Sequence, residues 1–553
     1  MPVITFDYND FIELLGYEIS KEEFINRIPM IGADFDKSED DSISIEFFPD
    51  RPDLSSVEGI ARAARAFFGF RPGMKTYEVL SSDVIMTVDP SVKKIRPYVQ
   101  CSIVKNVRMT DELIASLMDL QEKLHIGIGR NRKKVAIGVH NLEPLQPPFI
   151  YKAVDPTSVQ FIPLAKVESM TLKHILTNHE KGIAYAHLLD GFDKYPLIVD
   201  ANNNVLSFPP IINGTLTEVT PFTTEIFIDV TGTNPLAIQY ALHIVTTALA
   251  ERGGQIHSTT IIEGDTKKVS PDLTPKIRPL SISYVNRILG TTLDAPQIDR
   301  CLLKMGHQTK TISKDTLEVH IPSWRADILH EIDLVEDVAI GYGYDKFQKD
   351  LPSALTFGKK LPNQIFYDRL RMILVGFGFN EVTTFTLSND NDEFKKLGLP
   401  PGKRIEIQNP IGEEYSCIRV SLVPSLLKLL AENKHHSLPQ QIFELGLIVD
   451  EKHMNQYHLG GIKSSAKASF TECKSLVEAI LRETGIAASI IEKYHPAFIE
   501  GRCAAVVHKQ YGELGFFGEL HPRTITNFTL EHPSIAFEFT IHLLVDSLNA
   551  QYK

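Results

Sequence analysis

Residues 321 to 345 read IPSWRADILHEIDLVEDVAIGYGYD, and the acidic positions in this stretch have the spacing of one helical face. Asp327 lies where we expect the helix to begin, after a proline and a serine. Asp333, Glu336 and Asp337 follow at i, i+3 and i+4, so they share a face. Crowded carboxylates repel one another unless a cation neutralises them, and oxygen ligands suit Mg²⁺ or Ca²⁺. A solvated acidic face near a helix N-terminus, where the helix dipole favours negative charge, explains the same spacing.

The rest of the chain has an ordinary globular composition. It contains 553 residues, of which 43% are hydrophobic and 23% are charged, so several cores can form. At about 150 residues per domain, this length predicts three to four domains. The net charge of −12 argues against a surface that binds nucleic acid throughout. Contact with RNA would then need a local patch or a partner subunit.

Cysteine usage and the N-terminus indicate the compartment. The chain has five scattered cysteines and no C-x-x-C pair, which argues against a disulfide framework and against a structural zinc site. The first residues are acidic where a signal peptide needs positive charge. No apolar stretch reaches the roughly 18 residues that span a bilayer. We therefore expect a soluble, cytoplasmic protein without membrane contact.

Shifts in pattern and two proline-bearing linkers divide the chain into four predicted parts. An N-terminal α+β module spans 1–76, and a mixed α/β domain spans 80–265. A small module that carries the acidic helix spans 270–346. The last domain, 357–553, alternates strand-like runs with helices, and no tandem repeat is visible. The predicted fold class is multidomain α+β.

Two helix starts have recognisable signals. In SSVEGIARAARAFFGF, Ser55 and Glu58 have the spacing of a capping box, and apolar residues then follow one helical face. In the last domain, a well-patterned helix is predicted to be capped by Ser421, with Pro424 in its first turn.

Familiar nucleotide and hydrolase motifs are missing from the sequence. There is no G-x-x-x-x-G-K-[ST] loop, no G-x-G-x-x-G between a strand and a helix, no H-E-x-x-H and no G-x-S-x-G elbow. A nucleotide site of a familiar kind is therefore not predicted for this chain.

Several longer segments carry a resemblance to a known family. Pro322 to Asp345 is similar to a module of phenylalanyl-tRNA synthetase β chains. PDRPDLSSVEGIARA (49–63) resembles the N-terminal signature of that family. Segments similar to its archaeal and eukaryotic editing domain are GRNRKKVAIGVHNL (129–142), LSFPPIING (206–214) and IDVTGTN (228–234). Segments similar to its catalytic-like domain are QNPIGEEYSCIRVSLVPSLL (408–427), FELG (443–446), HPAFIEGRCA (495–504) and FGELHP (517–522).

This resemblance implies a fold and a set of partners. It implies an editing domain, a small winged-helix-like module, and a class II synthetase-like domain with an antiparallel sheet and flanking helices. The partners would be an α subunit, in an α₂β₂ heterotetramer, and tRNA(Phe). The family assigns Mg²⁺, shared with the α subunit, to positions that match Asp327, Asp333, Glu336 and Asp337. The chain ends soon after AFEFTIHLL, which makes us expect the archaeal type without a C-terminal anticodon-binding domain.

The resemblance places an editing site in the middle domain. Phenylalanine and tyrosine differ by one hydroxyl, and a hydrophobic pocket rejects an added hydroxyl only weakly, so a second hydrolytic site is the physical remedy. The candidate residues are Leu197, Ser207, Asn213, Asp229 and Thr231. Leu197 would be an apolar wall, Asn213 offers donors and acceptors, and Asp229 would pair an α-ammonium group. We expect the substrate's own ribose and polar groups to activate water. Without the resemblance, the same motifs describe a buried turn.

The sharpest basic cluster comprises Arg130, Arg132, Lys133 and Lys134. It would contact tRNA phosphates, or it forms a solvated hairpin; the sequence favours neither.

The last domain has isolated arginines, Arg419 and Arg502, and no G-x-G-x-x-R pattern. The ATP that drives adenylation is therefore expected on the α subunit, and this domain would act as scaffold and interface. The first hypothesis is a β subunit of phenylalanine–tRNA ligase that also edits Tyr-tRNA(Phe). The alternatives are a freestanding aminoacyl-tRNA deacylase and a non-catalytic tRNA-binding scaffold.

Overall fold

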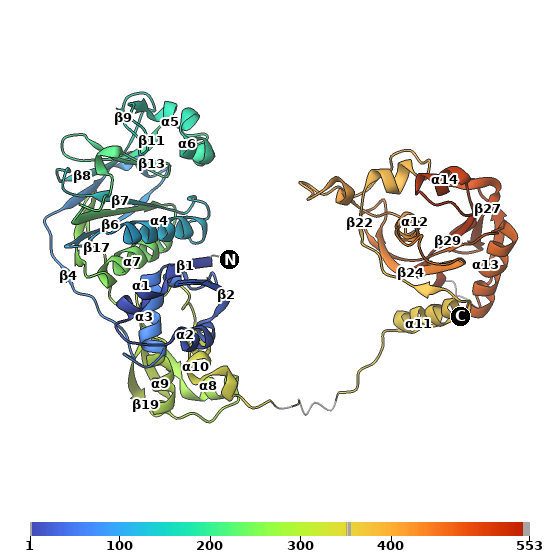
Figure 1. Cartoon of the computed structure of the whole chain (residues 1–553), viewed down its shortest axis with the longest axis horizontal. Helices are drawn as coiled ribbons and strands as arrows, with labels where there is room; N and C mark the ends of the chain where they lie inside the picture. Colours follow the sequence, from blue (N-terminus) through green and yellow to red (C-terminus); the bar gives the residue numbers. More distant parts are fainter. Residues whose placement is uncertain (1–2, 350, 352–355, 546–553) are drawn as a thin grey trace. The chain divides into compact units, whose positions relative to one another are not determined.

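The computed structural model describes residues 3–349, 351 and 356–545, and the chain divides into two compact units, Met1–Leu351 and Pro352–Lys553 (Figure 1). The multidomain α+β class predicted from the sequence is confirmed.

The chain begins with a small antiparallel sheet covered by helices. Its strand order is β1-β3-β2, with bounds β1 Val3–Asp7, β2 Ala33–Glu39 and β3 Ser42–Phe47. The helices are α1 Tyr8–Leu15, α2 Lys21–Arg27 and α3 Val57–Phe67. The predicted capping residue of α3 was wrong by one position. Ser56 is the N-cap and accepts from the backbone N–H of Gly59, because α3 follows a 3-10 turn at Pro52–Leu54.

Two sheets make up the middle of the first unit. The five-stranded sheet has the order β4 Val79–Leu80, β15 Gln255–His257, β6 Tyr98–Lys105, β14 Glu225–Gly232 and β7 Val135–Asn141. The seven-stranded sheet has the order β13 Ile212–Asn213, β12 Val205–Phe208, β11 Tyr195–Val199, β8 Phe149–Val154, β5 Ile85–Val88, β16 Thr259–Glu263 and β17 Thr266–Ser270. Strand β17 thus continues this sheet just past residue 265, where the predicted domain ends.

The five-stranded sheet is buried on both faces, which explains its apolar central strand. Ile226, Ile228 and Val230 of β14 pack into a core with helices α4 Asp111–Ile126 and α7 Pro235–Glu251. Phe227 points the other way, into a core shared with the seven-stranded sheet. Because side chains alternate along a strand, Asp229 and Thr231 lie on the Phe227 side. Figure 1 shows α4 and α7 on the side of the sheet that faces α1 and α3.

Smaller elements complete the first unit. Beside the seven-stranded sheet lie β9 Gln160–Phe161, β10 Met170–Thr171, α5 Leu172–Asn178 and α6 Glu180–Tyr185. A three-stranded sheet follows, in the order β18 Lys276–Ser281, β20 Thr316–Ile321 and β19 Gln308–Ser313. It packs with α8 Ile282–Leu289, α9 Ala295–Lys304 and α10 Glu331–Tyr342.

The second unit is built on a largely antiparallel sheet. Its order is β21 Asn380–Glu381, β24 Gln440–Val449, β25 Asn455–Ser464, β29 Ser534–Thr540, β28 Gly512–Leu520, β27 Phe498–His508 and β26 Ser489–Glu492. Helices α11 Pro362–Gly376 and α13 Phe470–Thr484 contribute to one core of this unit. Helices α12 Val423–Glu432 and α14 Pro522–Asn527 contribute to another. A short pair, β22 Leu387–Ser388 and β23 Cys417–Ile418, lies outside the main sheet.

The predicted cap of α12 was also wrong. The N-cap position is Leu422, and its neighbour Ser421 donates its hydroxyl to Glu538 Oε2 at 2.6 Å. The same carboxylate oxygen accepts from the backbone N–H groups of Leu422 and Val423. The Ser421 hydroxyl also accepts from the Val423 N–H at 3.2 Å, so the serine and a buried glutamate from β29 share the start of α12.

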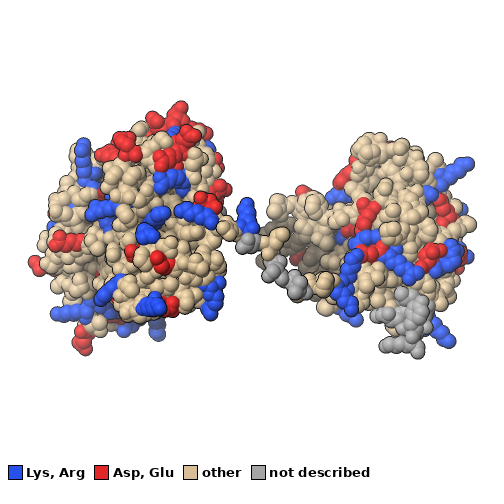
Figure 2. Space-filling view, turned by 90° about the horizontal axis from the view of Figure 1, so that it is seen from below, with Lys and Arg blue, Asp and Glu red and all other residues tan. Residues whose placement is uncertain are grey.

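Surface charge is mixed. In the face shown in Figure 2, acidic side chains gather along one edge of the first unit, and Lys and Arg side chains are scattered across its middle. Among the residues that the structure describes, no helix is both long and apolar enough to cross a membrane.

Candidate functional site

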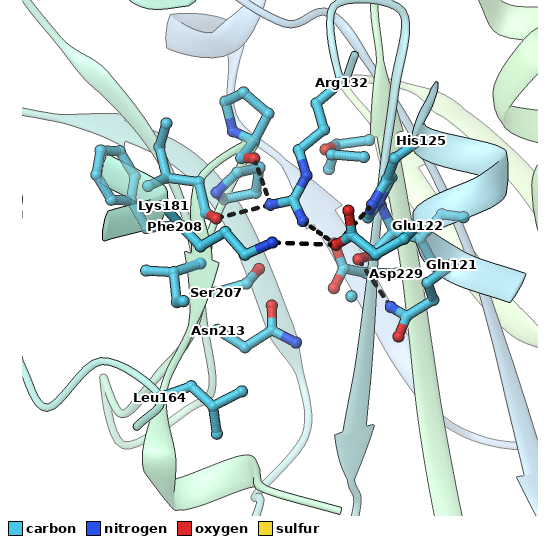
Figure 3. A pocket seen from close by; sticks show the side chains of 18 of the residues that line it. Gln121, Glu122, His125, Arg132, Leu164, Lys181, Ser207, Phe208, Asn213 and Asp229 are labelled. Atoms are coloured by element: carbon cyan, nitrogen blue, oxygen red, sulfur yellow. Dashed lines mark hydrogen bonds and ion pairs between the residues drawn. The ribbon is translucent and has the colours of Figure 1, made fainter. Parts of the chain in front are cut away.

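A cavity of about 280 Å³ in the first unit is lined by residues of α4, β7, β12, β14 and α6 (Figure 3). Ser207, Asn213, Asp229 and Thr231 line it, although they come from two separate sequence motifs. Arg132, predicted as part of a basic cluster, lines it as well. We call this space the editing cavity, after the site that the sequence predicts here.

Asp229 is the most deeply held carboxylate of the editing cavity. It is only 1% exposed, and its Oδ2 lies 2.7 Å from His140 Nε2. The other ring nitrogen of His140 lies 2.7 Å from Thr217 Oγ1, which fixes the imidazole. Position 138 is glycine because a Cβ there would lie 2.1 Å from Asp229 Oδ2. The backbone of β7 therefore approaches this carboxylate closely.

Two hydroxyls near Asp229 differ in how they are satisfied. Thr231 Oγ1 accepts from Arg96 Nε at 2.9 Å, and Arg96 also donates to the Thr231 carbonyl at 2.8 Å. Burial lowers the pKa of Arg96 to about 10. The hydroxyl of Ser207 is 97% buried yet has no hydrogen-bond partner among the described residues. Since an unpaired buried hydroxyl is costly, Ser207 marks a position where a bound ligand would complete the site.

A second, more exposed carboxylate is surrounded by positive charge. Glu122 Oε1 lies 2.5 Å from Arg132 Nη2 and 3.5 Å from Lys181 Nζ, and Figure 3 shows both cations pointing at it. His125 Nδ1 lies 3.7 Å from the same oxygen. The His125 ring, Arg132 and Lys181 together lower the pKa of Glu122 to about 2. Burial lowers the pKa of His125, so this ring is neutral near pH 7.

Arg132 is held by an unusual backbone turn. Arg130, Asn131 and Arg132 all have positive φ, at 47°, 53° and 64°, a conformation that non-glycine residues rarely adopt. The turn aims the Arg132 guanidinium into the editing cavity, where it donates to the Ile211 carbonyl at 2.9 Å. The guanidinium also lies 4.5 Å from the ring centre of Tyr185.

The remaining predicted residues lie outside the editing cavity. Leu197 is fully buried in the core beneath β11 and does not line the cavity. Arg130 and Lys133 are exposed and Lys134 is half-buried, so these side chains face away from the cavity that Arg132 enters. The four basic residues are thus split between two environments.

Sequence reasoning missed the side of the cavity that α4 supplies. Gln121, Glu122 and His125 come from this helix, and His140 comes from β7. A signal was present, because Gln121 and His125 are polar residues at i and i+4 on the buried face of α4. His140 is likewise a polar residue in an otherwise buried strand.

The acidic stretch at 321–345 has a different environment. Helix α10 begins at Glu331, so Asp327 lies in the preceding loop, where Arg325 donates to it at 2.6 and 2.8 Å. Arg325 also donates to Asp337 at 2.7 Å, and His307 Nε2 lies 2.5 Å from the same Asp337 oxygen. We call these four residues the Arg325 cluster. Burial by itself would raise the pKa of Asp337. The charge of Arg325 outweighs this effect and holds that pKa far below its ordinary range.

The other two predicted magnesium ligands remain near the surface. Asp333 Oδ2 accepts from the backbone N–H groups of Leu329 and His330, which caps α10. Glu336 is exposed; partial burial and nearby carboxylates raise its pKa. Among the described residues, no group of three or more His, Cys, Asp or Glu side chains is arranged to hold a metal. A shell of all four carboxylates therefore does not fit this chain alone, whereas Asp333 and Glu336 stay available to a site completed from outside.

The isolated arginines of the second unit are engaged in structural contacts. Arg419 is buried and donates to Glu444 at 2.7 Å and to Thr384 Oγ1 at 2.7 Å. Arg502 is on the surface and pairs with Glu519 at 2.8 Å. Arg419 is thus committed to holding β24 in place.

Comparisons with known proteins place the chain in one family. Residues 348–541 match a family model described as the phenylalanyl tRNA synthetase beta chain CLM domain, and residues 278–344 match the tRNA synthetase B5 domain. The phenylalanine–tRNA ligase beta subunit of Methanothrix thermoacetophila is 45% identical over 545 residues, which is 98% of this chain and 100% of that protein. The corresponding subunit of Methanosarcina acetivorans is 46% identical and covers 99% of both chains.

A solved structure is also similar. The crystal structure of an N-terminal fragment of the phenylalanyl-tRNA synthetase beta subunit from Pyrococcus horikoshii covers 62% of this chain and 99% of that fragment. Its TM-score is 0.60 at 37% sequence identity. Since relatives above 40% identity span almost the whole chain, the chain belongs to the family of phenylalanine–tRNA ligase β subunits.

Proposed function

We propose that this chain pairs with an α subunit, in an α₂β₂ assembly, for the ATP-dependent attachment of phenylalanine to tRNA(Phe) in the cytoplasm. Segments 80–265 and 357–553 would divide the labour, the first for editing and the second for assembly. The α subunit would bind ATP, because Arg419 of the second unit is committed to Glu444 and Thr384.

We further propose that the editing cavity hydrolyses Tyr-tRNA(Phe). The observation that carries this proposal is the buried hydroxyl of Ser207, which has no partner among the described residues and lines the same cavity as the carboxylate of Asp229. A tyrosine phenol can donate to Asp229 and accept from Ser207. Phenylalanine would leave the Ser207 hydroxyl unpaired and Asp229 with only its contact to His140. A site built to bind a hydroxyl strongly rejects the analogue that lacks it. Asp229 is therefore better suited to the phenol than to the α-ammonium that the sequence suggested.

Glu122 is the better partner for the α-ammonium group of the aminoacyl ester. It is ionised at neutral pH and only about half buried, so a ligand can reach it. Arg132 and Lys181 beside it would move toward the tRNA backbone when the ammonium takes their place. Asn213 is half-buried on the cavity wall, and within the described part of the chain its side chain makes one long hydrogen bond, at 3.4 Å to the Val139 carbonyl. Its amide is thus free to orient the ester or the attacking water.

Water is the nucleophile that fits this cavity. A serine nucleophile needs a base within hydrogen-bond reach, and Ser207 Oγ has no partner of any kind among the described residues. His125, whose imidazole lines the cavity, already uses Nε2 to accept from the Ile137 N–H at 2.9 Å. The substrate's ribose hydroxyl and Asn213 would therefore position the water.

The α subunit would dock near helix α10. A groove there is lined by Ile288, Ile332 and Tyr344, which are exposed apolar side chains, and by Asp333 and Glu336. Mg²⁺ commonly takes one or two carboxylates from a protein and fills its shell with water or other ligands. Asp333 and Glu336 would hold the ion, and it would neutralise the crowded carboxylates that raise the pKa of Glu336.

The test is deacylation of Tyr-tRNA(Phe) by the wild type and by Asn213→Ala and Asp229→Ala. We expect Asn213→Ala to lower the rate about 100-fold, the size typical for loss of one orienting group. Asp229→Ala should instead admit Phe-tRNA(Phe) as a substrate. Unchanged rates and unchanged selectivity in both variants would remove the assignment and leave a non-catalytic tRNA-binding scaffold.

Co-purification separates the ligase subunit from a freestanding deacylase. We expect the chain to be recovered with an α subunit, and Arg130, Lys133 and Lys134 to contribute to tRNA affinity from the exposed side of their turn. A stable monomer that deacylates tRNA as fast as the assembly would favour the freestanding enzyme.

A further inference from the structure

A second pocket of the first unit is strongly basic, and it shares no lining residue with the editing cavity. It has a volume of about 140 Å³ and lies where α3, residues 71–76 and the loop 322–325 meet. Its cationic lining residues are Arg51, Arg62, Arg65, Arg71, Lys75 and Arg325. The only carboxylate that lines it is that of Asp53, among the residues that the structure describes. We call it the basic pocket.

Four carboxylates neutralise part of this charge. Arg51 pairs with Asp53 at 2.9 Å, and Arg325 pairs with two aspartates of the Arg325 cluster. Arg65 and Lys75 share the single carboxylate of Glu251.

Arg62 and Arg71 remain without a carboxylate. Neither forms a salt bridge with any residue of 3–349, 351 or 356–545, so the basic pocket carries about two uncompensated positive charges. Burial and the neighbouring guanidinium groups of Arg65 and Arg62 also lower the pKa of Lys75, although Glu251 opposes this.

Arg62 is the central residue of the basic pocket. It is only 7% exposed, and its guanidinium carbon lies 4.3 Å from the ring centre of Trp324. Nη1 donates to Thr247 Oγ1 at 2.8 Å and to the Tyr77 hydroxyl at 3.4 Å. Nε and Nη2 make no hydrogen bond to a described residue and are not among the fully buried atoms without a partner, so both reach the open space of the pocket. Glu251 and Asp53 favour the charged form of Arg62 from nearby, and a buried cation is most stable when it is paired. The two free donors are therefore available to an anion that enters the pocket.

We propose that the basic pocket binds a phosphate group. A guanidinium presents parallel N–H donors that match two oxygens of a phosphate, and its rigid fork makes such pairs specific. The dianion would compensate the two charges left over, with Arg62 below it and Arg71 at the exposed rim. The volume holds a few water molecules, which suits a tetrahedral oxyanion and excludes a whole nucleotide.

The test is equilibrium dialysis of radiolabelled inorganic phosphate against the full-length chain, at constant ionic strength in KCl. We expect saturable binding by the wild type and at least tenfold weaker binding by Arg71→Ala. Arg71 makes no side-chain contact that folding would depend on among the described residues. Arg108→Ala is the matched control, because Arg108 is an exposed arginine of the same unit outside the basic pocket, and it should bind as the wild type does.

A second variant tests the geometry of the buried donors. Arg62→Lys keeps the positive charge but removes the parallel N–H donors of the guanidinium. Phosphate binding should therefore weaken at least tenfold, while the ability of chloride to compete with phosphate should stay unchanged. Absence of saturable phosphate binding by the wild type, or an equal loss in Arg108→Ala, would overturn the proposal. The wild-type titration and Arg71→Ala decide this even if Arg62→Lys does not fold.

The phosphate could be a free ion or part of a tRNA backbone, and a third arm separates them. Dialysis is repeated with saturating unmodified tRNA transcript. Displacement of the labelled phosphate assigns the basic pocket to a tRNA phosphodiester. Retention assigns it to a free phosphate or pyrophosphate. Both results are expected of a phosphate site, and both require that Arg71→Ala binds more weakly.

Discussion

The editing cavity and the Arg325 cluster are both built around buried carboxylates, yet their polar groups are satisfied in opposite ways. In the Arg325 cluster, each aspartate receives a guanidinium at 2.6 to 2.8 Å, and His307 adds a further contact to Asp337. In the editing cavity, Ser207 has no hydrogen-bond partner among the residues that the structure describes, and Glu122 lines the open space together with its two cations. A closed network of this kind holds a fold together, whereas an incomplete one is ready to receive a ligand.

The largest effect that separates the two regions is expected from Arg325→Met. This change leaves Asp327 and Asp337 without their cation, and removing one partner of a buried pair costs about 3–5 kcal/mol. Urea unfolding followed by circular dichroism measures it. Arg278→Met is the control, because Arg278 is a half-exposed arginine in the same small sheet, without a salt bridge among the described residues. A loss below about 1 kcal/mol for Arg325→Met would show that the Arg325 cluster is not structural.

Glu122→Gln should act on activity and leave stability nearly unchanged. The amide keeps the shape but loses the charge that we propose for the α-ammonium, so kcat/KM for Tyr-tRNA(Phe) deacylation should fall about 100-fold, or about 2.7 kcal/mol. Its ion pairs are partly exposed and contribute less than about 1 kcal/mol to folding. Glu112→Gln, on the exposed first turn of α4, should retain full activity. If Glu122→Gln lowered the unfolding free energy but left the deacylation rate unchanged, Glu122 would have a structural role like that of the aspartates in the Arg325 cluster.

His243 links the helix layer to the loop of the Arg325 cluster, and it predicts a pH dependence. Its Nδ1 donates to the Ser323 carbonyl at 3.1 Å, and burial lowers its pKa to about 4. The unfolded chain, with an ordinary pKa of about 6.5, binds this proton more readily. The stabilisation is therefore present above pH 6.5 and is lost as the pH falls toward 4.

Between pH 7 and pH 5, His243 should account for a loss of about 2 kcal/mol in unfolding free energy. His243→Gln keeps a donor for Ser323 but does not titrate, so this part of the loss should vanish. Paired urea titrations at the two pH values measure the difference. Equal losses in wild type and variant would mean that the folded-state pKa of His243 is close to its ordinary value, as it would be if water reached the ring.

The smallest effect should be seen in substrate choice. Ser207→Ala removes one of the two groups that we propose for the tyrosine hydroxyl, so the ratio of Tyr-tRNA(Phe) to Phe-tRNA(Phe) deacylation should fall about tenfold, or about 1.4 kcal/mol. Folding stability should rise slightly or stay constant, because an unpaired buried hydroxyl is lost. Ser102→Ala is a matched control, since Ser102 is another buried serine whose hydroxyl has no partner in the described part of the chain, and it lies outside the editing cavity. A drop in both variants would assign the change to packing.

The sequence predicted local motifs well and long-range partners poorly. Ser207, Asn213 and Asp229 could be found because each lies in a short segment with a recognisable pattern. Glu122 was missed because it reaches the same cavity from α4, more than eighty residues earlier in the chain than Ser207. Helical spacing placed Asp333, Glu336 and Asp337 on one face, but it could not reveal that Arg325 folds back onto Asp337. Both predictions of a helix N-cap missed the actual residue by one position. A 3-10 turn precedes α3, and a glutamate distant in sequence binds the start of α12.

The turn of Arg130, Asn131 and Arg132 has a consequence for engineering the protein. Three successive residues with positive φ each carry roughly 1 kcal/mol or more of backbone strain. Glycine adopts this conformation freely, so Asn131→Gly would relax the strain without touching a proposed contact, whereas Arg130→Gly would also remove a cation that we propose for tRNA. The same exchange at Arg132 would relax the turn and also delete the guanidinium that spans Glu122 and the Ile211 carbonyl. Thermostabilisation of this loop must therefore stop one residue short of the cavity.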